Sequence, residues 1–368
     1  MKILDVINFI ESWAPKQISW DKDNAGLQIG SRDVSIDAIL LVLDVDDQVF
    51  KKAVRNSANL IISHHPLIFN PLKNLDFGVK RNQLIKNLIK HEITLYSAHT
   101  NLDFTKDGVS FALAQKLGLK GIDFIENIPQ TQYKIVTFVP QKNLETVLTS
   151  LSTAGAGLIG EYSNCSFQTE GIGTFRGSEL SNPSVGKKGK LEKVAEVKLE
   201  MIFEKWKLNA LLKALHESHP YEEPAYDIYP LENKNVNFGY GAFGILDKQV
   251  ETEKFIRKVK TSLNAPSVKW TRGKLKPIQK VGVCGGSGSD LIQSAIAKKC
   301  DAFVTSDVKY HTFQDYEDEI VLIDVDHYYS EAVILEVFKN KLEKFFKSQN
   351  VKVPVEIYYQ QENKIRVL

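Results

Sequence analysis

The sequence predicts an α/β protein in which a discontinuous α/β domain is interrupted by an inserted α+β domain. Short apolar runs of strand length alternate with helical patterns near both ends of the chain, whereas the middle follows a different order of strands and helices. The length of 368 residues agrees with two domains, because a chain of this size is too long for one compact core.

The first block of the α/β domain covers residues 1–125 and begins with an amphipathic helical pattern. The expected strands cover 37–44, 60–62 and 93–97, and the expected helices cover 48–56, 79–91 and 107–118. Strands that are apolar throughout are typical of a sheet that is buried on both faces. We therefore expect a largely parallel sheet with helices packed on it.

The same alternation returns in the second block of the α/β domain, residues 247–368. Strands are expected at 281–284, 302–304 and 320–323, and helices at 290–299 and 327–346. The two blocks together would form one domain that is discontinuous in sequence.

Residues 126–246, between these blocks, have the order βαββαβ. The expected elements are strand 134–139, helix 143–152, strands 166–176 and 197–203, helix 208–217 and strand 225–228. This is the order of the ferredoxin-like split motif, so an inserted ferredoxin-like domain is expected.

Composition indicates an ordinary globular protein of a reducing compartment. Apolar residues make up 43% of the chain and charged residues 25%. The net charge is only +2, and basic and acidic residues are mixed along the chain, so the sequence does not predict the clustered positive surface that nucleic acid or an anionic membrane would require. No window reaches the length of about 20 apolar residues that a membrane span needs, and the N-terminus lacks a signal-peptide pattern. The three cysteines are widely spaced and form no Cys-x-x-Cys pair, so thiolate metal binding is not expected. We expect a cytoplasmic protein.

The first chemical signal is the pair His64 and His65, which follows an expected strand and precedes Pro66. Pro66 cannot donate a ladder hydrogen bond, so the pair marks the carboxyl end of the strand, where α/β sheets bind ligands. Neighbouring side chains of an extended chain diverge, so each histidine could serve a different ion of a two-metal centre. The alternative is an inert, hydrogen-bonded loop pair.

The second signal is the pair His327 and Glu331, four residues apart at the start of an expected helix. The two side chains share a face of the helix, and the same face continues in an apolar stripe that must be buried. A carboxylate at such a position requires a cation or an ion pair. Metal binding explains the position better than a salt bridge, because the helix follows a strand end.

The third signal is the segment from His99 to Asp103, which also follows an expected strand. Asp103 would be an oxygen ligand, and His99 a further ligand or a partner of the ligands. Because Asn and Asp favour turns, this segment alone could be only a turn. The hypothesis depends on three strand ends meeting.

Two further segments carry weaker signals. Gly286 and Gly288 lie in a glycine-rich stretch between a strand and a helix, where backbone amides could hold a phosphate. A tight turn is the alternative, since the stretch lacks the P-loop lysine and the full dinucleotide fingerprint. His311 follows another strand and could line the same pocket. The segment from His219 to Pro224 joins an expected helix to an expected strand, so we expect it to form a turn or an interface rather than a metal site.

Together, four motifs resemble those of the NIF-three-like dinuclear metal-centre family, also catalogued as GTP cyclohydrolase I type 2 homologues. The motifs cover residues 63–69, 97–103, 305–311 and 326–331. The resemblance implies five metal ligands, namely His64, His65, Asp103, His327 and Glu331. It further implies that Glu331 bridges the two ions and that His99 and His311 are pocket residues near the centre. The family's longer bacterial members carry a PII/CutA-like insert, and the resemblance implies a toroidal homohexamer.

The expected function is metal-assisted hydrolysis by two divalent ions per subunit, with Zn, Fe, Mn, Co and Ni all compatible with imidazole and carboxylate ligands. The catalogue label implies attack of metal-activated water on the guanine ring of GTP, so a nucleotide or another small molecule would be the ligand. A phosphoester hydrolase would use the same ligands. The alternative is a non-catalytic assembly that holds or delivers metal or regulates a partner, for which the PII-like insert is the relevant feature.

Overall fold

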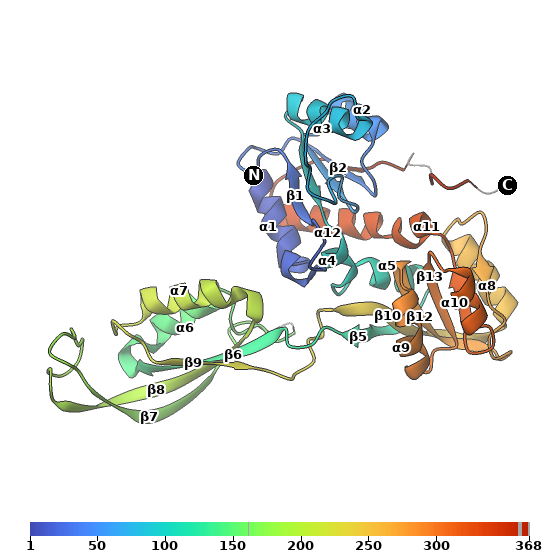
Figure 1. The fold of residues 1–368 in the computed structure, drawn as a ribbon. Coiled ribbons are helices and arrows are strands. Elements are labelled where there is room, and N and C mark those ends of the chain that lie inside the picture. Colours follow the sequence, from blue (N-terminus) through green and yellow to red (C-terminus); the bar gives the residue numbers. More distant parts are fainter. Residues whose placement is uncertain (161, 360–362, 367–368) are drawn as a thin grey trace. The chain divides into compact units, whose positions relative to one another are not determined.

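The computed structural model describes residues 1–160, 162–359 and 363–366. The chain divides into two compact units, Met1–Asn127 with Asn237–Leu368 and Ile128–Val236 (Figure 1). The smaller unit is shorter than the predicted insert of 126–246. The difference arises because residues 239–250 form a strand that pairs within a sheet of the larger unit.

The first sheet of the larger unit has the strand order β1-β4-β3-β2-β15. Its strands are β1 (Gly26–Ile29), β2 (Ile39–Val42), β3 (Leu60–Ser63), β4 (Thr94–Ser97) and β15 (Val355–Ile357). The helices packed on it are α1 (Ile3–Trp13), α2 (Asp47–Arg55), α3 (Lys80–Lys90) and α12 (Ile334–Ser348). Strands β15, β2, β3 and β4 are parallel, and β1 is antiparallel at one edge.

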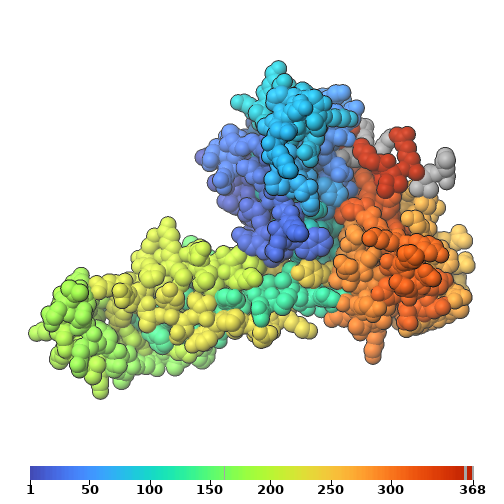
Figure 2. Space-filling view, viewed as in Figure 1, coloured from blue at the N-terminus to red at the C-terminus, as the bar shows by residue number. Residues whose placement is uncertain are grey.

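Side chains of this sheet alternate between two cores, as the pleat of a strand requires. Ile39 and Leu41 of β2 lie in a core with α1 and α12, whereas Leu40 and Val42 lie in a core with α2 and α3. Helices therefore cover both faces, which explains why the strands are apolar throughout. Figure 2 shows the first part of the chain in blue and the last part in orange and red, side by side within the larger unit.

The second sheet of the larger unit has the order β11-β14-β13-β12-β10-β5. Its strands are β5 (Lys120–Asn127), β10 (Gly239–Val250), β11 (Lys269–Trp270), β12 (Ile278–Ser287), β13 (Ala302–Ser306) and β14 (Val321–Asp324). Strands β12, β13 and β14 are parallel, but the remaining pairings are antiparallel. The prediction of a largely parallel sheet is therefore right for the centre and wrong for the edges.

Further helices and 3-10 turns complete the larger unit. They are α4 (Thr100–Asp103), α5 (Val109–Lys116), α8 (Thr252–Ser262), α9 (Ile292–Ala297), α10 (Tyr310–Asp315), α11 (His327–Glu331) and the 3-10 turns η1 (Lys16–Ile18) and η4 (Ser289–Leu291). The predicted helix 327–346 is thus two helices, α11 and α12. The longest described helix, α12, has 15 residues, and no described helix has the combined length and apolarity that a membrane crossing requires.

The smaller unit is a four-stranded antiparallel sheet of order β7-β8-β6-β9. Its elements are β6 (Gln132–Pro140), η2 (Gln141–Asn143), α6 (Leu144–Thr153), β7 (Phe167–Arg176), β8 (Leu191–Glu204), η3 (Lys205–Lys207), α7 (Leu208–Ser218) and β9 (Tyr226–Pro230). The chain order is βαββαβ, as predicted, and this strand order is that of the ferredoxin-like motif. A closer likeness to PII or CutA stays a prediction.

We expect Leu342→Ala to destabilise the larger unit, because Leu342 of α12 is fully buried in the core that α12 shares with α1. Removing a buried leucine side chain should lower the free energy of unfolding by about 2–5 kcal/mol. Urea denaturation would measure this change. Lys344→Ala, at an exposed position of the same helix, is the control and should change the value by less than about 0.5 kcal/mol. Equal effects of the two variants would contradict the assignment of this core.

Candidate metal centre

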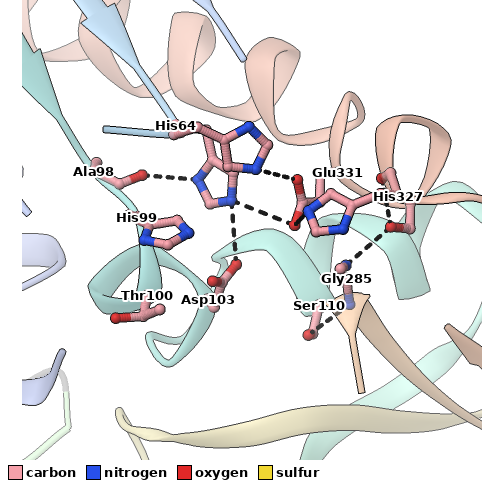
Figure 3. A network of polar contacts seen from close by, with 12 residues as sticks. His64, Ala98, His99, Thr100, Asp103, Ser110, Gly285, His327 and Glu331 are labelled. Carbon is pink, nitrogen blue, oxygen red and sulfur yellow. Dashed lines mark hydrogen bonds and ion pairs between the residues drawn. The ribbon is translucent and has the colours of Figure 1, made fainter. Parts of the chain in front are cut away.

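The candidate ligands come from three chain segments that follow parallel strands. His64 and His65 come directly after β3, and Asp103 closes the short helix α4 beyond β4. His327 and Glu331 are the first and last residues of α11, which follows β14. Figure 3 shows the side chains of His64, Asp103, His327 and Glu331 pointing toward one another from their separate elements. The structure therefore brings together the five ligands that the resemblance implied.

Glu331 lies at the middle of the cluster. Its Oε2 is 2.9 Å from His65 Nε2, and its Oε1 is 3.0 Å from His327 Nε2. His64 Nε2 is 3.6 Å from Glu331 Oε1 and also 3.6 Å from Asp103 Oδ1.

Among the described residues, three groups of candidate ligand atoms lie within 4.8 Å of one another, and two of these groups contain Glu331. One group is His65, His327 and Glu331, and the other is His64, Asp103 and Glu331. A carboxylate that belongs to two such groups has the position of a bridge between two ions.

Each histidine of the cluster uses its Nδ1 to bond an acceptor outside the cluster. His64 Nδ1 donates to the Ala98 carbonyl at 2.8 Å, which leaves its Nε2 with a free lone pair. The Nδ1–carboxylate pairs are His65 with Asp44 at 2.9 Å, His99 with Asp23 at 2.8 Å and His327 with Asp307 at 2.6 Å. Such partners fix the tautomer and ring orientation of metal-ligating histidines, so the pattern favours metal binding.

Buried polar atoms of the cluster lack hydrogen bonds. They are His64 Nε2, His65 Nε2, Asp103 Oδ1 and Glu331 Oε2. The contact between His65 and Glu331 is short, but the two groups lack the alignment of a hydrogen bond. Burying such atoms without a partner is costly, whereas a cation would satisfy several of them at once. The donor set of imidazole nitrogens and carboxylate oxygens therefore fits divalent metal ions.

The pKa shifts of the clustered carboxyl and imidazole groups also favour a site for divalent metal ions. Burial disfavours the charge on Glu331, but the neighbouring imidazoles of His64, His327 and His65 outweigh it and hold the pKa well below its usual range. Burial and the charge of Glu331 raise the pKa of Asp103 well above its usual range. Burial opposes the charge on His65, yet Asp44 and Glu331 raise its pKa to about 10. Without a cation, protons therefore supply the positive charge that the carboxylates require.

His99 lies beside the two ligand groups, held by Asp23. A ring nitrogen of His99 lies within 4.8 Å of ring nitrogens of His64 and His65. Asp23 has a side chain that is only 1% exposed and accepts the Thr100 amide at 3.1 Å as well as the His99 ring. Burial raises the pKa of Asp23, but the bonds from His99 and Thr100 outweigh it and leave the pKa below its usual value. An ionised Asp23 therefore orients His99 toward the cluster.

Sequence reasoning missed the three carboxylates that hold these histidines. Asp44 and Asp307 each follow a parallel strand, β2 and β13, so a search for acids just beyond strand ends could have found them. Asp23 lies in a loop before β1, and no local pattern distinguishes it from Asp21.

We expect Asp23→Asn to weaken metal binding, because an amide cannot give His99 the same charge and hydrogen-bond partner. The loss should be smaller than the roughly 10–100-fold that removal of a direct partner of a metal-binding histidine costs, because His99 lies beside the five proposed ligands and is not one of them. Competition with a chromophoric chelator would measure the change. Asp21→Asn, at an exposed position two residues away, should leave the affinity unchanged. A normal affinity in Asp23→Asn would show that His99 does not support the centre.

The glycine-rich end of β12 has a role other than the one expected. The Gly286 amide donates to Ser330 Oγ at 2.9 Å, and the Gly288 amide donates to Thr305 Oγ1 at 3.0 Å. Because both amides already have partners, the geometry does not support the phosphate-binding role predicted for Gly286 and Gly288. The absence of side chains instead lets β12 approach Glu331 closely, since a Cβ on Gly286 would lie 2.4 Å from Glu331 Oε1.

Two other predicted positions lie elsewhere. His311 is exposed on α10, contacts Gln314 at 3.5 Å and is not among the residues that line the pocket beside the cluster. His311 is thus exposed and does not line this pocket, and its expected role near the centre stays a prediction. His219 accepts the Tyr221 amide and bonds the Phe138 carbonyl at 3.0 Å, which is the turn role that was expected.

A pocket of about 330 Å³ opens beside the cluster. Asp103, His327 and Glu331 are among the residues that line it, so a molecule in the pocket would contact these candidate ligands. Cys284 also lines it; burial raises the pKa of this thiol to about 12, which keeps it protonated and unlike a thiolate ligand.

Comparisons with known proteins find relatives over nearly the whole chain. A model of the Duf34/NIF3 (NGG1p interacting factor 3) family matches residues 1–364. A Halalkalibacterium halodurans protein named GTP cyclohydrolase 1 type 2 homolog is 39% identical over 346 residues, which cover 94% of this chain and 93% of that protein. A Listeria innocua protein of the same name is 38% identical over 91% of this chain and 90% of its own length. A solved structure described as a Bacillus cereus protein related to NIF3 is 35% identical, with a TM-score of 0.86 over 100% of this chain and 99% of that one.

Proposed function

Since the chain belongs to the Duf34/NIF3 family, we propose that it is a metal-dependent hydrolase built on a two-ion centre. The proposed ligands are His64, His65, Asp103, His327 and Glu331. The observation that carries the proposal is the shared position of Glu331 in two groups of ligand atoms. Imidazole and carboxylate ligands suit Zn, Fe, Mn, Co or Ni, and they do not select one of these metals.

The bound ions would supply a water of lowered pKa and polarise the atom under attack. The chain's own residues would supply position and proton transfer. Glu331 keeps the two ligand groups together, and His99, oriented by Asp23, is placed to accept or return a proton beside them. The pocket next to Asp103 and His327 would bring the substrate to this point.

The proposed substrate is a nucleotide or a phosphoester. Relatives carry the name GTP cyclohydrolase 1 type 2 homolog, which suggests attack on the guanine ring of a nucleotide. The same two-ion centre would also cleave phosphoesters, because the ligand set does not determine which bond is broken. A protein that only holds or delivers metal, with its insert as a regulatory module, is the alternative.

Turnover by the metal-loaded protein tests the proposal. We expect chelator-sensitive product from GTP, from a nucleoside or from a member of a phosphoester panel. The double variant His64→Ala/Glu331→Ala should lose both metal and product. Metal retained by that variant would refute the ligand assignment, and absence of any chelator-sensitive product would refute the hydrolase and leave the metal-holding alternative.

The proposal includes a toroidal homohexamer whose metal centres face an internal cavity, which the family resemblance implies. Light scattering of the purified protein tests it directly. A mass of six chains is expected, and a monomer at micromolar concentration would contradict the assembly without affecting the ligand assignment.

A further inference from the structure

The walls of the pocket differ in chemistry from a nucleotide-triphosphate site. Three aromatic side chains line it, those of Trp20, Phe104 and Tyr240. Two exposed carboxylates, Glu126 and Asp290, lie on it in addition to the carboxylates of the metal cluster. None of its lining residues, all in the described part of the chain, is a lysine or an arginine.

We infer that this pocket selects an amino-substituted nitrogen heterocycle, as a free base or nucleoside, and discriminates against a polyphosphate chain. The inference rests on the proposed function for the metal centre, and it defines the class of molecule that the centre would act on. It differs from what the name of the relatives suggests, because that name implies a triphosphate.

The aromatic wall is suited to a planar ring. Phe104 and Tyr240 pack edge to face with centroids 4.7 Å apart, and Trp20 packs on Phe104 at 5.5 Å. Phe104 is buried, so this packing supports the other two rings, whereas Trp20 is 60% exposed. A large exposed indole on the wall of a pocket is a surface on which a heteroaromatic ring can stack.

The charges of the pocket favour N–H donors and oppose phosphates. Carboxylates such as Glu126 and Asp290 accept hydrogen bonds from amino and ring N–H groups and repel anions. The backbone amides that could have held a phosphate, those of Gly286 and Gly288, are bonded to Ser330 and Thr305. No lysine or arginine lies on its walls. The imidazoles of His99 and His327, which do line it, are already paired with carboxylates of Asp23, Asp307 and Glu331, so the pocket lacks the usual partners of a polyphosphate.

Equilibrium binding to the full-length protein tests the inference with four probes: guanosine, guanosine monophosphate, GTP and inorganic tripolyphosphate. Each is titrated by calorimetry against the metal-loaded and the metal-free protein, because direct contacts between phosphate and metal are absent from the latter. We expect guanosine to bind about 10-fold more tightly than GTP to the metal-free protein, with tripolyphosphate the weakest.

Two sets of variants sharpen the test. Trp20→Ala should weaken guanosine binding by at least about 5-fold, which is the lower range for loss of one stacking partner. The control is Trp270→Ala, because Trp270 lies on β11 and not on the pocket wall, and this variant should bind guanosine normally. The double variant Glu126→Gln/Asp290→Asn should reduce the difference in affinity between guanosine and GTP. Tighter binding of GTP or tripolyphosphate than of guanosine to the metal-free protein, or no binding of guanosine up to millimolar concentration, would overturn the inference.

These outcomes are separable from those that test the hydrolase. A protein with chelator-sensitive phosphoester turnover and no affinity for guanosine would refute only the pocket assignment. A protein that binds guanosine through Trp20 but shows no chelator-sensitive product would refute only the hydrolase.

Discussion

Glu331→Gln should remove both metal ions while the protein stays folded. Glutamine keeps the size of the side chain but removes the negative charge that faces His64, His65 and His327. Because Glu331 belongs to both ligand groups, neither ion would keep a complete set of ligands. The affinity should fall by more than the roughly 10–100-fold that loss of an outer partner costs. Elemental analysis after dialysis would measure the bound metal per chain.

Glu343→Gln is the matched control for this prediction. Glu343 lies on α12, is exposed and forms a surface ion pair with Lys339 at 3.8 Å. Exposed pairs of this kind contribute about 0–1 kcal/mol to stability, so this variant should keep its metal and its melting temperature. Two ions retained at normal affinity by Glu331→Gln would show that the carboxylate is not a shared ligand.

Much of the candidate centre could be predicted because its proposed ligands follow buried parallel strands. The apolar runs that became β3, β4 and β14 are visible without a structure, and ligand sites in α/β sheets lie at the carboxyl ends of strands. That reasoning found His64, Asp103 and His327 one segment at a time. Their meeting point could not be derived, since it depends on how the two sheets of the larger unit pack.

The hydrophobic pattern of the sequence did not predict strand β10 or the separation of α11 from α12. Strand β10 contains Gly239, Gly241 and Gly244, which lower its strand propensity, and its antiparallel pairing with β5 joins segments on either side of the insert. The separation of α11 from α12 is equally hidden, because residues 327–346 contain neither glycine nor proline. Periodicity therefore predicted one helix where the chain forms two.

Gly286→Ala should eliminate metal binding although Gly286 is not a ligand. The residue has φ +63°, and an added Cβ would lie 2.4 Å from Glu331 Oε1 and 3.4 Å from His327 Cε1. Glu331 is buried and surrounded by three imidazoles, so its carboxylate cannot move aside without leaving its ligand position. The steric conflict should also lower the free energy of unfolding by about 1–3 kcal/mol. Bound metal and urea denaturation together measure both effects.

Gly121→Ala separates backbone strain from the steric effect. Gly121 has φ +58°, close to that of Gly286, but a Cβ there would meet no atom within 4 Å. This variant should lose about 1 kcal/mol of stability through strain alone and keep both ions. Equal metal content in Gly286→Ala and Gly121→Ala would mean that the close approach of β12 does not position Glu331.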